Sequence, residues 1–230
     1  MENLEQRIQK IDVEKAMTRK SKKISGILET FKKAEKLKSV LRCAYTSDGK
    51  RKESSADHSW MLALLAVIFL PELKIKVNHL KVLKMLITHD LAEAIAGDSY
   101  PWDKKKRIGK HEREEEALRE IISMLPFQSR KEIMGLWQEF ERKKTKESRF
   151  AHAIDKLEVI LQHNVADIKT WLNGDFDLNP YWKDEYYNLD PFLRKFKDQV
   201  NSETMAKIAR AGKLSKVKPE HLKRYQRWEK

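Results

Sequence analysis

The stretch ITHDLAEA, residues 87–94, is the most informative part of this sequence. It ends an otherwise apolar helical segment, in which leucine and isoleucine recur at three- and four-residue steps and predict a core stripe. Burying an unpaired carboxylate costs several kcal/mol, so Asp90 needs a cation, a salt bridge or a capping role. His89 and Glu93 are four residues apart and share a face, so a metal beside the helix could bind His89 and Asp90 while Glu93 points at a bound water.

One His-Asp pair is weak evidence by itself, because it is also typical of a hydrogen-bonded core histidine next to a capping or ion-paired aspartate. Two other segments strengthen the metal interpretation. His58 lies on a predicted helix about thirty residues upstream, and Asp155 lies within an apolar helix downstream. The sequence therefore offers two histidines and two acids on three predicted helices.

The order His58, His89-Asp90, Asp155 resembles the signature of the HD-domain phosphohydrolases, and the flanking residues resemble the 5'-deoxynucleotidase branch of that superfamily. The resemblance spans about residues 28 to 165. The matching stretches are Glu53 to Trp60, HDLAEAIAGD (89–98), KHEREEEA (110–117), Leu136-Trp137, and Phe150 to Leu161.

The resemblance implies a helical domain in which His58, His89, Asp90 and Asp155 hold one divalent cation. Two nitrogens and two oxygens with open positions for water suit Mn, Co, Fe, Ni or Mg, and the sequence does not choose among them. The ion would lower the pKa of its water and polarise a phosphoryl oxygen, so that hydroxide attacks phosphorus in line with the leaving alcohol.

The resemblance also assigns roles to three residues around the metal. Glu93 matches the acid that positions or deprotonates the water, and Asp98 matches a residue that contacts the substrate and supports the proton network. The alternatives are a surface helix glutamate and an aspartate in a C-terminal turn. Arg42 resembles the arginine that anchors the substrate phosphate, and a guanidinium suits phosphate because its fork donates two parallel hydrogen bonds.

Two features depart from the family pattern or allow another interpretation. Cys43 stands where the family commonly has a tryptophan near the sugar, which leaves the preference for deoxyribose open, although Tyr45 is close enough in sequence to substitute. Lys110, His111 and the acids Glu114 to Glu116 could face the site. The favoured interpretation is a solvated face at the start of a helix, stabilised by the helix dipole.

The composition favours an all-α fold, because seven glycines, six prolines and 36% charged residues suit long helices. We expect a single domain over residues 1–230, with an HD core at about 26–171 and a C-terminal loop and helical extension at about 172–230. The predicted helices are 24–45, a segment from Ser54 or Ser55 to Pro71, one after the cap Asn78, 110–125, 129–143, 147–171 and 191–211. The segment 172–191 is predicted to be an ordered loop, and a basic tail follows residue 211.

The single cysteine, Cys43, excludes an intramolecular disulfide and a multi-cysteine zinc site, and we interpret it as a packed residue. The longest apolar run is far shorter than the roughly 20 residues that cross a bilayer, and the N-terminus does not resemble a signal peptide, so a cytoplasmic protein without membrane contact is expected. The net charge of +13 comes mainly from the two ends. Solvated helix faces are the favoured interpretation of these ends, with weak nucleic-acid contact as the alternative.

The predicted function is an enzyme, a divalent-metal-dependent 5'-nucleotidase that releases phosphate from nucleoside 5'-monophosphates, most of all deoxynucleoside ones. One alternative is an HD hydrolase of another small phosphate ester or of a nucleotide polyphosphate, because fold and metal define the reaction better than the substrate. Another is a non-catalytic nucleic-acid-binding protein, against which Glu93 and the complete ligand set argue. A homodimer is left open.

Overall fold

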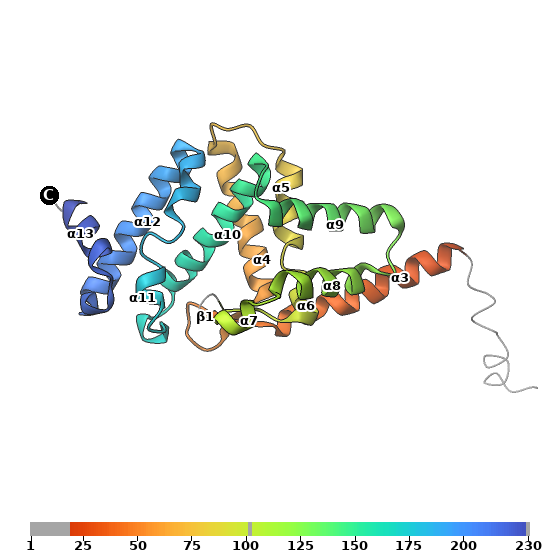
Figure 1. The fold of residues 1–230 in the computed structure, drawn as a ribbon, viewed down its shortest axis with the longest axis horizontal. Coiled ribbons are helices and arrows are strands. Elements are labelled where there is room, and N and C mark those ends of the chain that lie inside the picture. Colours follow the sequence, from red (N-terminus) through yellow and green to blue (C-terminus); the bar gives the residue numbers. More distant parts are fainter. Residues whose placement is uncertain (1–18, 101–102, 229–230) are drawn as a thin grey trace, which may run out of the picture.

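The protein folds into a layered array of helices with one short hairpin, as Figure 1 shows. This computed structural model describes residues 19–100 and 103–228. The predicted all-α fold is confirmed. The elements are α3 (Arg19–Glu35), β1 (Leu41–Tyr45), β2 (Lys52–Ser54), α4 (Ser55–Phe69), α5 (His79–Thr88), α6 (Glu93–Ala96), α7 (Lys104–Arg107), α8 (Lys110–Ile122), α9 (Phe127–Arg142), α10 (Lys146–Val165), α11 (Asp175–Leu178), α12 (Pro191–Arg210) and α13 (Pro219–Trp228).

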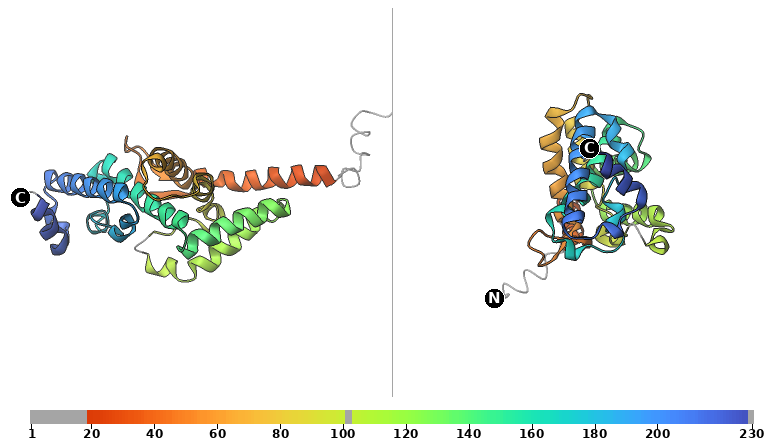
Figure 2. Two further views of the ribbon diagram at one scale, coloured as in Figure 1. Left: turned by 90° about the horizontal axis from the view of Figure 1, so that it is seen from above. Right: turned by 90° about the vertical axis from the view of Figure 1, so that its left-hand side faces the viewer.

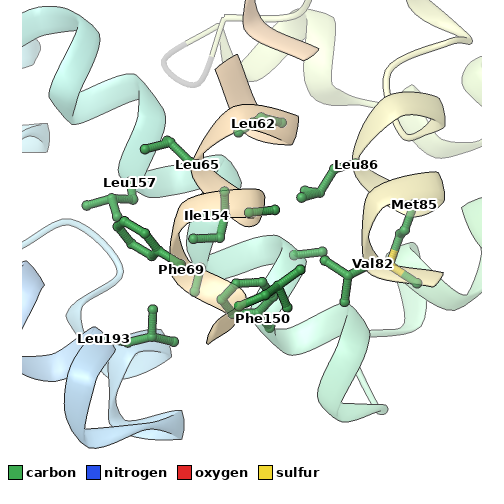
Figure 3. Close-up of a cluster of buried hydrophobic side chains, with 14 of the residues drawn as sticks. Leu62, Leu65, Phe69, Val82, Met85, Leu86, Phe150, Ile154, Leu157 and Leu193 are labelled. Carbon is green, nitrogen blue, oxygen red and sulfur yellow. The ribbon is translucent and has the colours of Figure 1, made fainter. Parts of the chain in front are cut away.

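Helix α10 is the centre of the fold, since it packs against α4, α5, α9 and α12. Its side chains Phe150, Ile154 and Leu157 are fully buried and lie among apolar side chains of α4 and α5, with Leu193 of α12 on the other side (Figure 3). The shared core fixes α4, α5 and α10 relative to one another. These three helices carry or directly precede all four predicted metal ligands.

The ends of the helices follow the predicted capping residues. Ser54 caps α4 in a capping box, in which its hydroxyl accepts from the Asp57 amide while the Asp57 carboxylate accepts from the Ser54 amide. Asn78 caps α5 through the Lys81 amide, as predicted. Gly97 ends α6 with a φ of 74°, a left-handed conformation that favours glycine.

The prediction of one helix up to Tyr45 is wrong. Helix α3 ends at Glu35, a short 3₁₀ turn η1 (Lys36–Ser39) follows, and residues 41–45 form strand β1, which pairs antiparallel with β2. The turn formers beyond Tyr45 close a hairpin, because the Gly49 amide donates to the Thr46 carbonyl at 2.8 Å and Gly49 adopts a φ of 67°. Arg42 and Cys43 therefore project from a strand and not from a helix.

Most of the large apolar side chains of α3 lie on its exposed side. Ile24, Ile27, Leu28 and Phe31 are 47–66% exposed. The helix docks on α8 through its small and polar face, where Thr30 Oγ1 donates to the Ile121 carbonyl at 3.2 Å. At Gly26 on that face, an added Cβ would lie 2.0 Å from the Met124 carbonyl oxygen, so the two backbones touch. Helix α3 packs beside α8, and Figure 2 shows its N-terminal part extending past the end of the green helices.

The stripe predicted on α5 is partly wrong for a similar reason. Leu86 is buried, but Leu80 and Ile87 are 62% and 55% exposed, and Val82 and Met85 take their places in the core. The core contacts of α5 come from α4, α9 and α10. Leu80 and Ile87 lie outside this core, and Ile87 lines a surface groove with Trp60 of α4.

The C-terminal part is more helical than predicted. Helix α10 ends at Val165 instead of about Trp171, and the segment 172–191 holds α11 and the 3₁₀ helix η4 (Asp184–Leu189). The tail after residue 211 contains α13. Trp171, Phe176, Met205, Ile208 and Val217 form a separate apolar cluster that joins these elements. None of the helices in residues 19–100 and 103–228 has the length and apolar character needed to span a bilayer.

Candidate metal centre

Three segments bring the predicted ligands together. His58 lies in the first turn of α4, His89 and Asp90 directly follow α5, and Asp155 lies midway along α10. The capping box at Ser54 fixes the start of α4, so it also fixes the position of His58 along the helix axis. One ligand atom each of His58, His89 and Asp155 lies within 4.8 Å of the other two.

The ligand atoms converge on one point. His58 Nε2 lies 3.3 Å from Asp155 Oδ1 and 3.8 Å from Asp90 Oδ2, and His89 Nε2 lies 3.1 Å from Asp90 Oδ1. Both Nε2 atoms are buried, and neither has a hydrogen-bond partner. Buried polar atoms are rarely left without partners, so two of them facing two carboxylates fit a cation between them.

The other ring nitrogens are held by fixed acceptors. His58 Nδ1 donates to Glu158 Oε2 at 2.6 Å, and His89 Nδ1 donates to the Leu86 carbonyl at 2.9 Å. These bonds leave both Nε2 atoms as free acceptors, which is the tautomer that a metal ligand needs. The residues present therefore fit a divalent cation held by two nitrogens and two oxygens.

Electrostatics in the cation-free site show the same convergence. Burial and the Arg42 charge lower the pKa of His58, but the Glu158 and Asp155 carboxylates outweigh them and raise it to about 10. Burial opposes the ionisation of Asp90 and Asp155, yet His89 next to Asp90 and Lys156 next to Asp155 keep the pKa of each carboxyl below its usual range. Without a cation, the proton of His58 and the positive charge of Lys156 offset the negative charge of Asp90 and Asp155.

Glu93 lies at the first position of α6, where it is buried and accepts a hydrogen bond of 2.7 Å from Ser55 Oγ. Burial and the neighbouring Asp90 carboxylate raise the pKa of Glu93 to about 8. A carboxylate whose pKa lies near neutrality can both take and return a proton. Ser55 fixes one of its oxygens and leaves the other for a second partner.

Arg42 reaches the site from strand β1. Its guanidinium lies 3.3 Å from Asp90 Oδ2 and 3.5 Å from Glu53 Oε2. Burial would lower the pKa of Arg42, but Asp98, Asp90, Glu93 and Glu53 raise it above its usual value, so the side chain stays charged. Asp98 follows Gly97 and lines the same cavity. The structure thus brings all seven predicted site residues to one place.

A cavity of about 430 Å³ lies beside the ligand set. Basic side chains from several elements share its lining: Arg42, Arg107, Lys110, Lys143, Lys156 and Lys183. Burial raises the pKa of the Cys43 thiol, which also lines the cavity, to about 11, so this cysteine is not a thiolate near neutral pH. The volume is in the range of pockets that take small molecules, and the basic lining suits an anionic one.

The favoured interpretation of Lys110 and Glu114 as a solvated face is wrong. Both line the cavity, Glu114 is buried, and Lys110 Nζ lies 3.1 Å from Glu114 Oε1. His111 also lines the cavity and stacks on Trp137 with ring centroids 5.0 Å apart. Helix α8 turns its first residues toward the site because its apolar side, with Leu118, packs against α6 and α9.

Some residues of the site were not predicted. Glu53 and Glu158 are buried behind His58, and burial together with the Glu158 charge raises the pKa of Glu53 to about 8. His152, one turn before Asp155 on α10, donates from Nε2 to the Phe140 carbonyl at 2.9 Å and lines the cavity. The polar residues on the buried face of α10 were the available signal, because His152, Asp155 and Glu158 recur every three residues.

Comparison with known proteins agrees with this geometry. A family model described as "HD domain" matches residues 34–197. The 5'-deoxynucleotidase HDDC2 of Mus musculus is 34% identical over 139 residues, which are 60% of this chain and 68% of that protein. The protein of the same name from Homo sapiens is 34% identical over 138 residues, 60% of this chain and 66% of that protein.

A solved structure shares the arrangement of helices. It is described as a predicted metal-dependent phosphohydrolase from Magnetospirillum magnetotacticum, and it superposes with a TM-score of 0.72 at 26% identity, covering 83% of this chain and 96% of its own. The superposition reaches beyond the 60% of this chain that the mouse relative matches.

Proposed function

This chain belongs to the HD domain family, and we propose that it is a divalent-metal-dependent 5'-nucleotidase that releases phosphate from nucleoside 5'-monophosphates, most of all deoxynucleoside ones. The observation that carries the proposal is the pair of buried, unpartnered Nε2 atoms of His58 and His89, which face Asp90 and Asp155 beside a basic cavity. Such a site provides a cation and a place for a phosphate side by side.

Each residue has a defined task in this proposal. His58, His89, Asp90 and Asp155 would hold a divalent cation, which when bound would lower the pKa of a water molecule and polarise a phosphoryl oxygen. Arg42 binds the phosphate through its two terminal nitrogens, while its ion pair with Asp90 fixes the direction of the side chain. Glu93, held by Ser55, accepts the proton of the attacking water. Asp98, which lines the same cavity, contacts the substrate and supports the network through which the proton taken up by Glu93 passes to the leaving alcohol.

The test is phosphate release from a panel of nucleoside monophosphates, supplied in turn with Mn²⁺, Co²⁺, Fe²⁺, Ni²⁺ and Mg²⁺, which also identifies the metal. The panel includes nucleoside triphosphates and small sugar phosphates, the alternative substrates. Release from monophosphates only when a metal is present supports the proposal. Release from polyphosphates alone would support the alternative hydrolase, and no release with any metal would contradict the proposed function.

The preference for deoxyribose is a separate part of the proposal. The names of the relatives refer to deoxynucleotides, whereas Cys43 leaves the cavity lining without the tryptophan that the family commonly has at this position. We therefore expect weaker discrimination against ribonucleotides than a bulky ring would impose. The ratio of kcat/KM for one deoxy- and ribonucleoside monophosphate pair measures it.

We also propose that the partner of this protein is a second copy of itself. Three neighbouring helices expose apolar side chains on one side, and a groove of about 490 Å³ between them joins Phe31 of α3, Trp60 of α4 and Ile87 of α5. Other exposed apolar side chains of the same three helices are Ile24, Ile27, Leu28, Leu64, Val67, Ile68 and Leu80.

The area and shape of this face favour a second copy. At roughly 100 Å² for each half-exposed side chain, these residues of α3, α4 and α5 together present on the order of 1,000 Å², against about 800 Å² per partner in a standard interface. A flat bilayer does not fill a groove, whereas a helix does. Each copy carries both an apolar helix, α3, and a groove. Two copies related by a two-fold axis can therefore each place α3 in the groove of the other.

The remaining expectations are proposals of the same kind. The HD core at about 26–171 and the extension at about 172–230 are proposed to fold as one domain, supported by α12, which packs on α10. A cytoplasmic location and weak nucleic-acid contact through the basic ends stay predictions from the sequence. Of the basic ends, residues 1–18 and 229–230 lie outside the described residues.

A further inference from the structure

The turn between α11 and η4 holds an unusual backbone. Tyr181 and Lys183 both adopt left-handed conformations, with φ of 63° and 49°, and they flank Trp182. Residues with a side chain rarely adopt this conformation, because the Cβ crowds the backbone. Two such residues on either side of one tryptophan require other contacts that stabilise their conformation. Backbone strain of this kind is common at binding sites.

The contacts that hold the turn come from the C-terminal helices. The Tyr181 amide donates to Asn201 Oδ1 of α12 at 3.2 Å, and the Arg224 guanidinium of α13 lies 4.2 Å from the centre of the Tyr181 ring. Arg224 also pairs with Asp184 Oδ2 at 2.6 Å. Helix α13 lies outside the stretch that matches the family model, so part of this support is an addition to the HD domain.

The turn places Trp182 at the cavity. The indole is half-buried, packs against the main apolar core, and lines the same cavity as Arg42 and Asp90. Lys156 Nζ lies 5.4 Å from the centre of the Trp182 ring and 2.7 Å from Asp155 Oδ2. A single ammonium group thus lies between a proposed metal ligand and the indole, so the indole is close to the proposed phosphate position at the ligands.

We infer that Trp182 is the wall against which the nucleobase of the substrate stacks. The inference rests on the proposed phosphatase function and deepens it, because it selects nucleoside monophosphates over sugar phosphates that lack a base. Every base offers a π face, so stacking binds purines and pyrimidines alike. The enzyme then tolerates different bases and requires that a base be present.

The test compares Trp182→Ala and Trp182→Phe with the wild type, using the metal-loaded full chain. The substrates are deoxyadenosine 5'-monophosphate, thymidine 5'-monophosphate and 2-deoxyribose 5-phosphate, which has no base. Stacking on an aromatic side chain supports a loss of about 10- to 100-fold in kcat/KM for both nucleotides in Trp182→Ala. The rate with 2-deoxyribose 5-phosphate stays the same in all three proteins, and Trp182→Phe keeps most of the nucleotide activity.

Two controls separate stacking from packing. Phe127→Ala truncates an exposed aromatic side chain of α9 that does not line the cavity, and it leaves the rates with all three substrates unchanged. Equal losses on nucleotide and sugar phosphate in Trp182→Ala would overturn the inference, because they would show that the indole only supports the turn. A wild type that hydrolyses 2-deoxyribose 5-phosphate as fast as the nucleotides would overturn it as well.

A binding measurement keeps this inference distinct from the proposed function. If the wild type releases no phosphate from any substrate, calorimetric titration with deoxyadenosine 5'-monophosphate still measures stacking. Weaker binding to Trp182→Ala by about 10-fold or more, with Trp182→Phe near the wild type, supports the inference while the proposed function fails. Equal affinities, or no binding to the wild type, overturn the inference.

Discussion

His58 Nδ1 lies 2.6 Å from the Oε2 atom of Glu158, one turn beyond Asp155 on the same helix, and both side chains are buried. One helix therefore supplies a proposed metal ligand and also orients the histidine that shares the ion. Glu158 acts on the metal only through His58, so it is a positioning residue.

The first prediction concerns this contact. Glu158→Ala should weaken metal affinity by about 10- to 100-fold, because the hydrogen bond that orients the His58 ring and sets its tautomer is lost. Glu158→Gln should lose less, since its amide oxygen still accepts the Nδ1 proton. Calorimetric titration with Mn²⁺ or Co²⁺ measures both. Equal affinities in Glu158→Ala and the wild type would show that packing alone holds His58.

The second prediction is that the metal supports the fold. Three helices converge on the ion, so metal binding stabilises the folded state by about 4 kcal/mol at a metal concentration a thousand times Kd. For a chain of this length that corresponds to a rise of roughly 8–16 °C in Tm. Thermal melts with metal and with chelator measure the shift. His58→Ala should abolish it, and an unchanged Tm with no metal found by elemental analysis would contradict the site.

The third prediction separates Glu93 from the ligands. Glu93→Gln keeps the hydrogen bond from Ser55 and cannot take a proton, so turnover should fall by about 10²- to 10⁴-fold while metal content stays the same. Rates at saturating substrate, with metal analysis on the same samples, measure it. A variant that keeps half of the wild-type rate would remove Glu93 from the mechanism.

Glu93 also makes the stability of the metal-free protein depend on pH. Burial raises its pKa from 4.5 to about 8, so its contribution to stability is fully present below pH 4.5 and is lost as the pH rises through about 8. In chelator, the Tm of the wild type should therefore fall more steeply between pH 5 and 8 than the Tm of Glu93→Gln. Comparing the two proteins cancels opposite contributions such as that of Lys197, whose pKa burial lowers to about 7. Parallel curves of Tm against pH for the two proteins would show that Glu93 is not the source of this pH dependence.

The proposed ligand set came from the resemblance to the HD domain family, because the residues alone also allowed a hydrogen-bonded core histidine next to a capping or ion-paired aspartate. The structure brings these four side chains together, and their role as ligands stays a prediction. The caps Ser54 and Asn78 and the stop at Gly97 could be predicted from the residues themselves, because they act on the nearest turn of backbone.

The sequence did not predict which side of a helix packs against its neighbour. The apolar residues of α3 recur on one side of the helix, but close contact between Gly26 and the Met124 carbonyl docks the opposite side next to α8. Periodicity shows which residues share a side and says nothing about which side is covered. Glu114 was misjudged likewise, since the apolar packing of α8 points this acid into the cavity.

The fourth prediction tests the proposed second copy. Phe31 is 66% exposed on α3, so Phe31→Asp places a charge in the groove contact and should convert a dimer into a monomer. Val165, 59% exposed at the far end of α10, provides the matched control Val165→Asp, which should remain a dimer. Light scattering during size-exclusion chromatography measures the mass. A monomeric wild type at micromolar concentration would contradict the proposal.

The fifth prediction concerns Arg42, which stays charged because four acids surround it. If its guanidinium binds the substrate phosphate, Arg42→Ala should weaken kcat/KM by about 1.5–3 kcal/mol, the usual range for a hydrogen bond to a charged group.

The substitution also leaves Asp90 and Glu53 without their cation, so a loss of activity could come from a displaced ligand. Arg42→Lys separates the two effects, because a lysine keeps the charge beside Asp90 and lacks the fork that donates two parallel hydrogen bonds. Metal content equal to that of the wild type, together with a kcat/KM still reduced by at least 1 kcal/mol in Arg42→Lys, assigns the fork to the phosphate. Full activity in Arg42→Lys would show that Arg42 serves only to offset the charge of its acidic neighbours.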